Sequence, residues 1–343
     1  MRTKRILLTG ASGTIGREIF KKLISQDNKY EITLLLRPSR KNKRQFKQWK
    51  EIFNIIWGNL QNYDDVEKAV FNKDIIIHAA GVLPDIAMFK PETAKLTNIG
   101  GTNNVLDAMK CQKTNPKIIF TSSSVVYRKS LENTIIKVSD PINRNPKDTY
   151  TFTKIEAEKS IINSGVDFCI FRISYVVSVD ILKFRKIMFY IPLDSWLEII
   201  HAKDVAQAIV NAIESDNVWG HIFNLGGGKD CQILYRENLN DYYEIMGFGR
   251  NFLPETAFVK RGLSSGIFDP QETQNLQKLL NFQQHTLQDF YTEVKEWVGI
   301  KRYLFHLVKP IARWYILRKS EIYQKIKKYP NKMSSIENIK NFD

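Results

Sequence analysis

Four pairs of tyrosine and lysine, each with a spacing of four residues, are the first feature of the sequence that suggests chemistry. A phenol has an unperturbed pKa of about 10 and is therefore a poor acid or base at neutral pH. A lysine one helical turn away would place a cation on the same helix face, where it stabilises the phenolate and lowers that pKa. Spacing alone does not choose among the four pairs, which are Tyr150/Lys154, Tyr291/Lys295, Tyr315/Lys319 and Tyr323/Lys327.

A glycine-rich turn near the N-terminus indicates a phosphate-binding site. The run Thr9-Gly10-Ala11-Ser12-Gly13-Thr14-Ile15-Gly16 follows an apolar strand and opens a predicted helix. Glycines let the chain turn tightly there and let backbone N–H groups approach a pyrophosphate, and the helix N-terminus favours the anion. Structural turns also use glycine, but the position after a first strand predicts dinucleotide binding by Gly10, Ser12, Gly13, Thr14, Ile15 and Gly16.

The end of the second predicted strand bears on the choice of dinucleotide. An acid there hydrogen-bonds the ribose 2′-hydroxyl of NAD, whereas an arginine accommodates the 2′-phosphate of NADP. The strand 31–36 ends at Arg37, and no carboxylate follows before Glu51. We therefore expect NADP(H) as the cofactor, with Arg37 as the contact to its 2′-phosphate. NAD(H) and a plain solvated basic loop are the alternatives.

Short apolar runs alternate with segments of helical periodicity along most of the chain. This alternation predicts an α/β fold, a Rossmann-type doubly wound parallel sheet with helices on both faces. Strands are predicted at 5–9, 31–36, 52–56, 75–78, 117–122, 168–173 and 222–225. Helices are predicted at 15–25, 65–71, 98–110, 151–164, 204–213, 239–246, 272–280 and 286–298.

The periodicity weakens after residue 173, which suggests a second, smaller unit. We expect a dinucleotide-binding Rossmann domain from residues 1–178 and 200–230. A small substrate-binding lobe would comprise residues 179–199 and 231–300. A helical basic tail, residues 301–343, would follow it.

The net charge of +15 over 343 residues comes from two local segments. Residues 37–50 hold seven basic residues and no acid, and residues 297–343 hold eleven basic residues and three acids, so the remainder is neutral. The first segment has only Phe46 and Trp49 to stack on bases, so we expect no nucleic-acid partner.

Cysteine usage and the N-terminus bear on the compartment. Cys111, Cys169 and Cys231 lie far apart and form no Cys/His ligand spacing, so we expect neither a metal site nor a disulfide framework. The first ten residues contain no long apolar run of the signal-peptide kind. These features predict a cytoplasmic protein.

Taken in order, the motifs resemble those of the extended short-chain dehydrogenase/reductase family, which includes sugar-nucleotide epimerases and many ketoreductases. The resemblance runs from residue 1 to about residue 247 and implies a Rossmann fold. Beyond the glycine turn it rests on Gly58-Asn59-Leu60, His78-Ala79-Ala80-Gly81, the run 98–106, Thr121-Ser122-Ser123-Ser124, Tyr150-Thr151-Phe152-Thr153-Lys154 and the run 200–206.

The resemblance implies roles for three residues. Tyr150 would be the acid/base, Lys154 would activate it and bind the nicotinamide ribose, and Ser123 would hold the substrate oxygen. Ser122 and Ser124 leave a one-residue shift open, and Ser123 is preferred for its spacing to Tyr127. The later Tyr/Lys pairs are then basic helix surfaces. Further cofactor contacts implied by the family are Asn59, Leu60, Ala79, Ala80, Gly81 and Asn98, with Asn59 standing where the family usually has Asp.

Two departures from the family's motifs bear on the substrate. Ser123 is followed by Ser124-Val125-Val126 and not by the acid-containing run of dehydratases, and Arg172-Ile173-Ser174-Tyr175 replaces the Arg-Pro-x-Asn of nucleotide-sugar enzymes. We therefore expect an NADP(H)-dependent carbonyl reductase or alcohol dehydrogenase acting on a small or moderately apolar carbonyl or alcohol. A nucleotide-sugar epimerase or reductase and a non-catalytic NADP-sensing regulator are the alternatives.

The tail is amphipathic. A helical wheel places Leu304, Leu307, Val308, Ile311 and Tyr315 on one face and Arg302, Lys309 and Arg313 on the opposite face, and Pro310 divides the segment into two helices. This pattern is typical of a helix lying on an anionic membrane. Docking on the protein core or on the partner of a homodimer would explain it equally well.

Two histidines that end apolar strands, His78 and His201, are expected to form local hydrogen bonds and not to take part in catalysis. Asp204 is expected to cap the helix that follows it.

Overall fold

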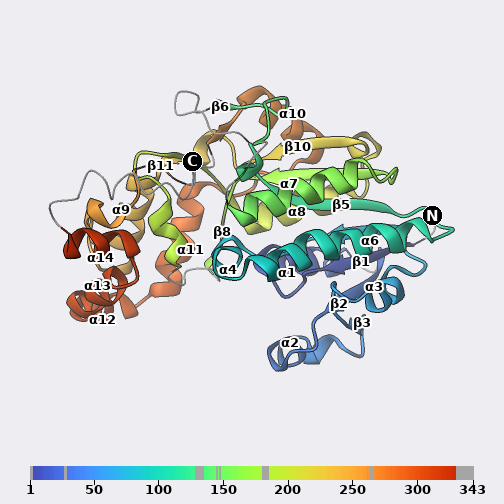
Figure 1. Ribbon diagram of the computed structural model, residues 1–343, viewed down its shortest axis with the longest axis horizontal. Helices are drawn as coiled ribbons and strands as arrows, with labels where there is room; N and C mark the ends of the chain where they lie inside the picture. Colours follow the sequence, from blue (N-terminus) through green and yellow to red (C-terminus); the bar gives the residue numbers. More distant parts are fainter. Residues whose placement is uncertain are drawn as a thin grey trace.

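A seven-stranded parallel sheet forms the centre of the computed structural model (Figure 1). The structure describes residues 3–26, 29–127, 135–143, 146, 148–179, 185–260, 262 and 266–329. Its strand order is β3-β2-β1-β4-β5-β7-β10, so the direction of strand addition reverses between β1 and β4. The strands are β1 (Lys4–Thr9), β2 (Tyr30–Leu36), β3 (Asn54–Trp57), β4 (Ile75–His78), β5 (Lys117–Ser123), β7 (Phe168–Ile173) and β10 (His221–Leu225).

Helices cover both faces of this sheet. One face buries apolar residues of α1 (Thr14–Ile24), α8 (Ala202–Ala212) and α10 (Pro270–Leu280). The other buries apolar residues of α3 (Tyr63–Val70), α6 (Gly101–Lys110) and α7 (Thr149–Ile162). Strands buried on both faces read as nearly continuous apolar runs, which is why the sequence pattern predicts them well. The predicted doubly wound α/β fold is confirmed.

A second hydrophobic core lies beside the sheet, drawn mainly from residues 177–199, 231–259 and 287–326. Its elements are the small sheet β11-β9-β8 (Gln232–Leu234, Trp196–His201, Tyr175–Val177), α9 (Tyr235–Met246), α11 (Leu287–Val298), α12 (Lys301–Leu307), α13 (Lys309–Leu317) and α14 (Glu321–Lys328). The remaining elements are the paired short strands β6 (Ile135–Ile136) and β12 (Ile267–Phe268) and the short helices α2 (Arg40–Gln45), α4 (Pro84–Phe89) and α5 (Pro91–Ala94).

The structure differs in one place from the expected division into a sheet domain and a lobe. Residues 270–282 were expected in the lobe, but Leu276, Leu280 and Phe282 pack into the core of the main sheet beside α8. The side chain of Asn211, on α8, donates a hydrogen bond of 2.6 Å to the Leu280 carbonyl. The domain division as a whole stays a prediction, and tail residues 330–343 lie outside the described residues.

None of the helices within the described residues combines the length and the apolar character that crossing a bilayer requires.

Candidate active site

The motifs that the sequence singles out meet at the carboxyl edge of the parallel sheet. The glycine turn follows β1, Ala79-Ala80-Gly81 follows β4, and Ser123 is the last residue of β5. Carboxyl ends of parallel strands share one edge, and ligands of such sheets bind there, where the direction of strand addition reverses. That reversal lies between β1 and β4 in this chain.

The glycine turn brings the end of β1 into direct contact with the end of β4. Gly10 has a φ of +79°, and a Cβ at this position would lie 2.6 Å from the Ala80 nitrogen. A Cβ on Gly16 would overlap the Gly10 carbonyl oxygen. No side chain of the described residues caps α1, and its first turn holds no acid, so its leading N–H groups stay open to an anion. The turn therefore fits a pyrophosphate.

The buried side chain of His78 stabilises the contact between the ends of β1 and β4 by hydrogen bonds. Thr102 donates its hydroxyl to the Asn98 carbonyl at 2.6 Å, so His78 Nε2 must donate to Thr102 Oγ1, at 3.1 Å. His78 Nδ1 then accepts from Thr9 Oγ1 at 2.8 Å. Burial lowers the pKa of His78 to about 3, so the ring is neutral. The expectation of local hydrogen bonds is confirmed for His78.

Asn98 and Gly81 lie where the segment after β4 meets α7, at the carboxyl edge of the sheet. Asn98 lies in a single π turn, Lys95–Gly100, a geometry that is frequent at functional sites. Its amide accepts from the Val82 nitrogen at 2.7 Å and donates to Thr153 Oγ1 at 2.9 Å, which ties the segment after β4 to α7. A Cβ on Gly81 would lie 3.7 Å from the Lys154 ammonium. Contacts of Ala79, Ala80, Gly81 and Asn98 with a cofactor stay a prediction.

Ser123 and Tyr150 are brought together. Tyr150 stands at the second residue of α7, which Asp148 caps by accepting from the Thr151 nitrogen at 2.8 Å. Burial raises the pKa of Tyr150 to about 12, the Asp148 carboxylate adds to the rise, and a hydrogen bond with Ser123 opposes it. The phenol is thus neutral at pH 7 and holds a proton to give, while the positive end of α7 favours the phenolate once it forms.

Lys154 lies one turn further along α7, with its ammonium 6.0 Å from the centre of the Tyr150 ring. It donates to the Thr121 carbonyl at 2.7 Å and lies 4.7 Å from the centre of the Phe120 ring. Burial lowers the pKa of Lys154 to about 8, so it remains mostly charged at neutral pH. The expected lowering of the Tyr150 pKa by this cation is not seen, and burial sets the direction of the shift.

The cofactor-selecting end of the sheet is exposed. Arg37 follows β2 directly, its side chain faces solvent, and its carbonyl accepts from the buried Asn42 amide at 2.9 Å. The Asn59 side chain accepts from the Gln61 nitrogen at 3.2 Å, so it closes its own turn after β3. The Leu60 carbonyl accepts from Asn104 at 2.7 Å. Roles of Arg37, Asn59 and Leu60 in binding a cofactor stay predictions.

The chain matches a known family over more than half its length. The model of the NAD dependent epimerase/dehydratase family matches residues 6–226. The chain belongs to this family. The match ends just after β10, so it spans the main sheet.

Curated relatives agree with this membership. A Methanocaldococcus jannaschii protein named "Putative UDP-glucose 4-epimerase" is 27% identical over 278 residues, which are 74% of this chain and 85% of the relative. Methionine adenosyltransferase 2 subunit beta of Rattus norvegicus is 24% identical over 221 residues, 60% of each protein. The chain therefore covers less than two thirds of the length of that relative.

Solved structures of the same fold cover most of the chain. UDP-glucose 4-epimerase from Bifidobacterium longum, in complex with NAD+ and UDP, superposes with a TM-score of 0.66 at 20% identity over 86% of this chain and 98% of that chain. MoeE5 in complex with UDP-glucose and NAD gives 0.67 at 19% identity over 88% and 99%. These likenesses confirm the extended short-chain dehydrogenase/reductase fold expected from the motifs.

A buried polar network next to Ser123, Tyr150 and Lys154 was not predicted from the sequence. Glu158, one turn after Lys154 on α7, pairs with Arg172 of β7 at 2.8 Å and accepts from the Ser122 hydroxyl. Arg172 also donates to the Tyr127 hydroxyl at 3.0 Å. Ser122 therefore points to the opposite side of β5 from Ser123, which favours Ser123 over Ser122. The choice of Ser123 as the site serine stays a prediction. An arginine inside an apolar strand was the available signal, because buried arginines are paired.

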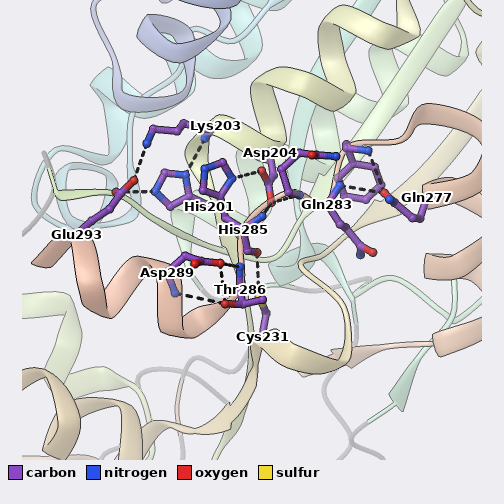
Figure 2. A network of polar contacts seen from close by, with 12 residues as sticks. His201, Lys203, Asp204, Cys231, Gln277, Gln283, His285, Thr286, Asp289 and Glu293 are labelled. Atoms are coloured by element: carbon purple, nitrogen blue, oxygen red, sulfur yellow. Dashed lines mark hydrogen bonds and ion pairs between the residues drawn. The ribbon is translucent and has the colours of Figure 1, made fainter.

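His201 belongs to a separate network that joins α8 to α11 (Figure 2). Its ring stacks on that of His285 with centres 4.6 Å apart and bonds to Glu293 at 3.0 Å, which confirms the local role expected for it. His201 itself caps α8, through the Lys203 nitrogen. The expectation that Asp204 caps this helix is wrong, because the Asp204 carboxylate bonds to the His285 ring at 2.6 Å and to its backbone nitrogen at 3.0 Å.

Replacing Gly16 by alanine should weaken dinucleotide binding by roughly tenfold or more, because the added methyl would push α1 away from Gly10. Gly100→Ala is the matched control, since a Cβ there meets nothing within 4 Å and its φ of −58° suits alanine. Fluorescence titration with NADPH and NADH measures the affinity. Equal affinity in the two variants would contradict the assignment of this turn to the cofactor.

Replacing Arg172 by methionine should lower the free energy of unfolding by about 3–5 kcal/mol, because the buried Glu158 loses its cationic partner and keeps only the Ser122 hydroxyl. Lys159→Met removes an exposed pair with Glu156 on the same helix and should cost less than about 1 kcal/mol. Urea unfolding followed by circular dichroism compares the two. Similar losses would show that the Glu158–Arg172 pair does not fix α7 to β7.

Proposed function

We propose that this protein is an NAD(P)-dependent oxidoreductase that transfers hydride at a hydroxyl-bearing carbon of its substrate, with nucleotide-sugar epimerisation as the favoured reaction. The observation that carries the proposal is the meeting of Ser123, Tyr150 and Lys154 beside the glycine turn. Family membership and the names of the M. jannaschii relative and of the B. longum structure support the epimerase type.

The three side chains divide the work by position. A bound nicotinamide would take or supply the hydride. Ser123, which both donates and accepts, would hold the substrate oxygen next to the Tyr150 hydroxyl. Tyr150 would give its proton to the carbonyl oxygen as the carbon is reduced. In the oxidising step its phenolate, which Lys154 and the N-terminus of α7 favour, would take the hydroxyl proton. Lys154 would use the N–H groups not given to Thr121 to bind the nicotinamide ribose and would offset charge on the phenolate.

Two features around the site bear on the substrate. The buried hydroxyl of Ser174, directly after β7, has no hydrogen-bond partner among the described residues and would be satisfied by a polar substrate. In contrast, Leu83, Ile86 and Phe89 of the α4 segment expose apolar side chains. That apolar rim supports the second candidate, a carbonyl reductase for a moderately apolar ketone or aldehyde.

We propose NADP(H) as the preferred cofactor. Arg37 stands at the end of β2, and its guanidinium has no hydrogen-bond partner among the described residues. The basic residues after it, through Lys50, are all exposed as well. The B. longum and MoeE5 structures are named with NAD, so this preference would set the chain apart from those proteins.

Tyr150→Phe should lower turnover by roughly 10²–10⁴-fold while leaving dinucleotide affinity unchanged, because only the transferable proton is removed. Tyr315→Phe, in an exposed pair with the same spacing to Lys319, is the matched control and should retain full activity. The assay screens nucleotide sugars for isomerised product and a panel of carbonyl compounds for NADPH absorbance loss.

Isomerisation without net consumption of cofactor identifies an epimerase, and steady loss of NADPH identifies the reductase. Full activity of Tyr150→Phe in whichever reaction is found would refute the catalytic assignment. A protein that binds dinucleotide but turns over none of these compounds would instead support a regulator, in keeping with the relative named as a subunit of methionine adenosyltransferase.

Arg37→Asp should reverse the cofactor preference by roughly 10²-fold, since a carboxylate repels the 2′-phosphate and accepts from the 2′-hydroxyl of NAD. Lys47→Asp makes the same charge change in the same basic segment at another exposed position and should alter the preference by less than about threefold. The ratio of the dissociation constants for NADPH and NADH is the quantity compared. An unchanged ratio for Arg37→Asp would contradict the 2′-phosphate contact.

A further inference from the structure

The C-terminal helices α12 and α13 turn one face toward the lobe. Leu317 is buried in the lobe core, and Phe305 stacks on Phe248 with ring centres 5.7 Å apart. The Ser320 hydroxyl, just beyond α13, donates to the Ala257 carbonyl at 2.7 Å. Docking on the core, one of the explanations for the amphipathic tail, therefore accounts for this face.

The opposite face of the same helices is apolar and faces solvent. Its exposed fractions reach 84% at Ile300, 76% at Leu307 and 68% at Ile311. The stripe repeats every three or four residues and comprises Ile300, Leu304, Leu307, Ile311 and Trp314, with Trp297, Tyr303 and Tyr315 at its sides. A soluble surface carries scattered apolar residues, but a continuous stripe of this kind marks an interaction site.

The same segment is strongly basic. Between residues 297 and 320 the chain has six lysines and arginines and no acid. Four of these cations lie over the aromatic rings of the stripe, Lys301 on Trp297 at 5.1 Å, Arg302 on Tyr303 at 5.9 Å, Arg318 on Trp314 at 4.7 Å and Lys319 on Tyr315 at 5.2 Å. The apolar stripe is thus bordered by aromatic rings and by positive charge.

We propose that this surface, residues 297–319, binds to an anionic lipid bilayer. Leu304, Leu307 and Ile311 would enter the boundary between headgroups and acyl chains. The amphipathic rings of Trp314 and Tyr315 would lie at headgroup level. Lysine and arginine would extend to lipid phosphates while their aliphatic stems cover the apolar boundary.

A bilayer fits this surface better than a second copy of the chain or a nucleic acid. Pairing of two copies through the stripe would bring two acid-free basic segments together, and like charges in contact oppose association. Nucleic acid would satisfy the cations but would leave the aliphatic residues at 304, 307 and 311 without a partner. An anionic lipid surface supplies both negative charge and an apolar phase.

Flotation of the full-length protein with vesicles tests the proposal. Vesicles of phosphatidylcholine with about 30 mol % phosphatidylglycerol should carry most of the protein upward, and pure phosphatidylcholine should carry much less. Leu307→Gln/Ile311→Gln keeps the charge and removes apolar contact, and should reduce the bound fraction by roughly tenfold. Arg313→Gln/Arg318→Gln removes two cations and should reduce it on anionic vesicles to a similar extent.

Matched controls change the same residue types elsewhere on the surface. Ile52→Gln/Phe71→Gln replaces two equally exposed apolar residues, and Lys68→Gln/Lys113→Gln removes two exposed cations on the far side of the main sheet. Both should float like the unmodified protein. Circular dichroism and dinucleotide affinity, which the stripe does not touch, verify that every variant is folded.

Three results would overturn the proposal. The unmodified protein could fail to float with anionic vesicles. Leu307→Gln/Ile311→Gln could float unchanged, which would show that charge alone holds the protein on the vesicles. In sedimentation velocity the same variant could convert a dimer to a monomer without any effect on vesicles, which would make a second copy the occupant of the stripe.

Discussion

The buried ion pair between Glu158 and Arg172 determines where α7, the helix that carries Tyr150 and Lys154, lies. It links α7 to β7, and the Ser122 hydroxyl adds β5 to the same point. These are the elements that carry Tyr150, Lys154 and Ser123. A shift of α7 by one residue would leave two charges buried and unpaired, which costs several kcal/mol. The register that brings Tyr150 to Ser123 is therefore set from beneath the site, by groups that never reach the substrate.

The cofactor side of the site is built on a different principle. There the end of β1 approaches the end of β4 more closely than any side chain allows, because Gly10 has none, and α1 packs against the same turn because Gly16 has none. Neutral His78, at the end of β4, bonds to Thr9 of β1 and to Thr102 of α6. Backbone N–H groups and a helix terminus, not particular side chains, face the anion. A turn that depends so little on side chains is compatible with a fold shared at about 20% identity.

The sequence was most informative where contacts are local or periodic. Apolar runs predicted every strand of the main sheet to within a few residues, and the glycine turn was evident from its position after β1. The helix α2 was missed, because it is anchored by distant residues. Phe46 packs on Phe20 of α1 with ring centres 5.8 Å apart, and a local sequence pattern cannot predict a contact between residues so far apart in the chain. The pKa of Tyr150 was also mispredicted, since its burial depends on elements far apart in the chain.

The two basic segments, proposed to bind different anions, resemble each other in composition and differ in how their aromatic residues pack. Both combine lysine and arginine with a few aromatic residues, and they lie well apart in the molecule (Figure 1). In residues 37–50 the aromatic side chains turn inward, Phe46 and Trp49 onto Phe20, so the cations are exposed and the aromatic rings are not. In residues 297–319 the aromatic rings turn outward with the cations. A compact phosphate requires only charge, whereas a lipid surface rewards apolar contact as well. The direction in which the aromatic residues point, which only the tertiary packing decides, therefore distinguishes the two surfaces.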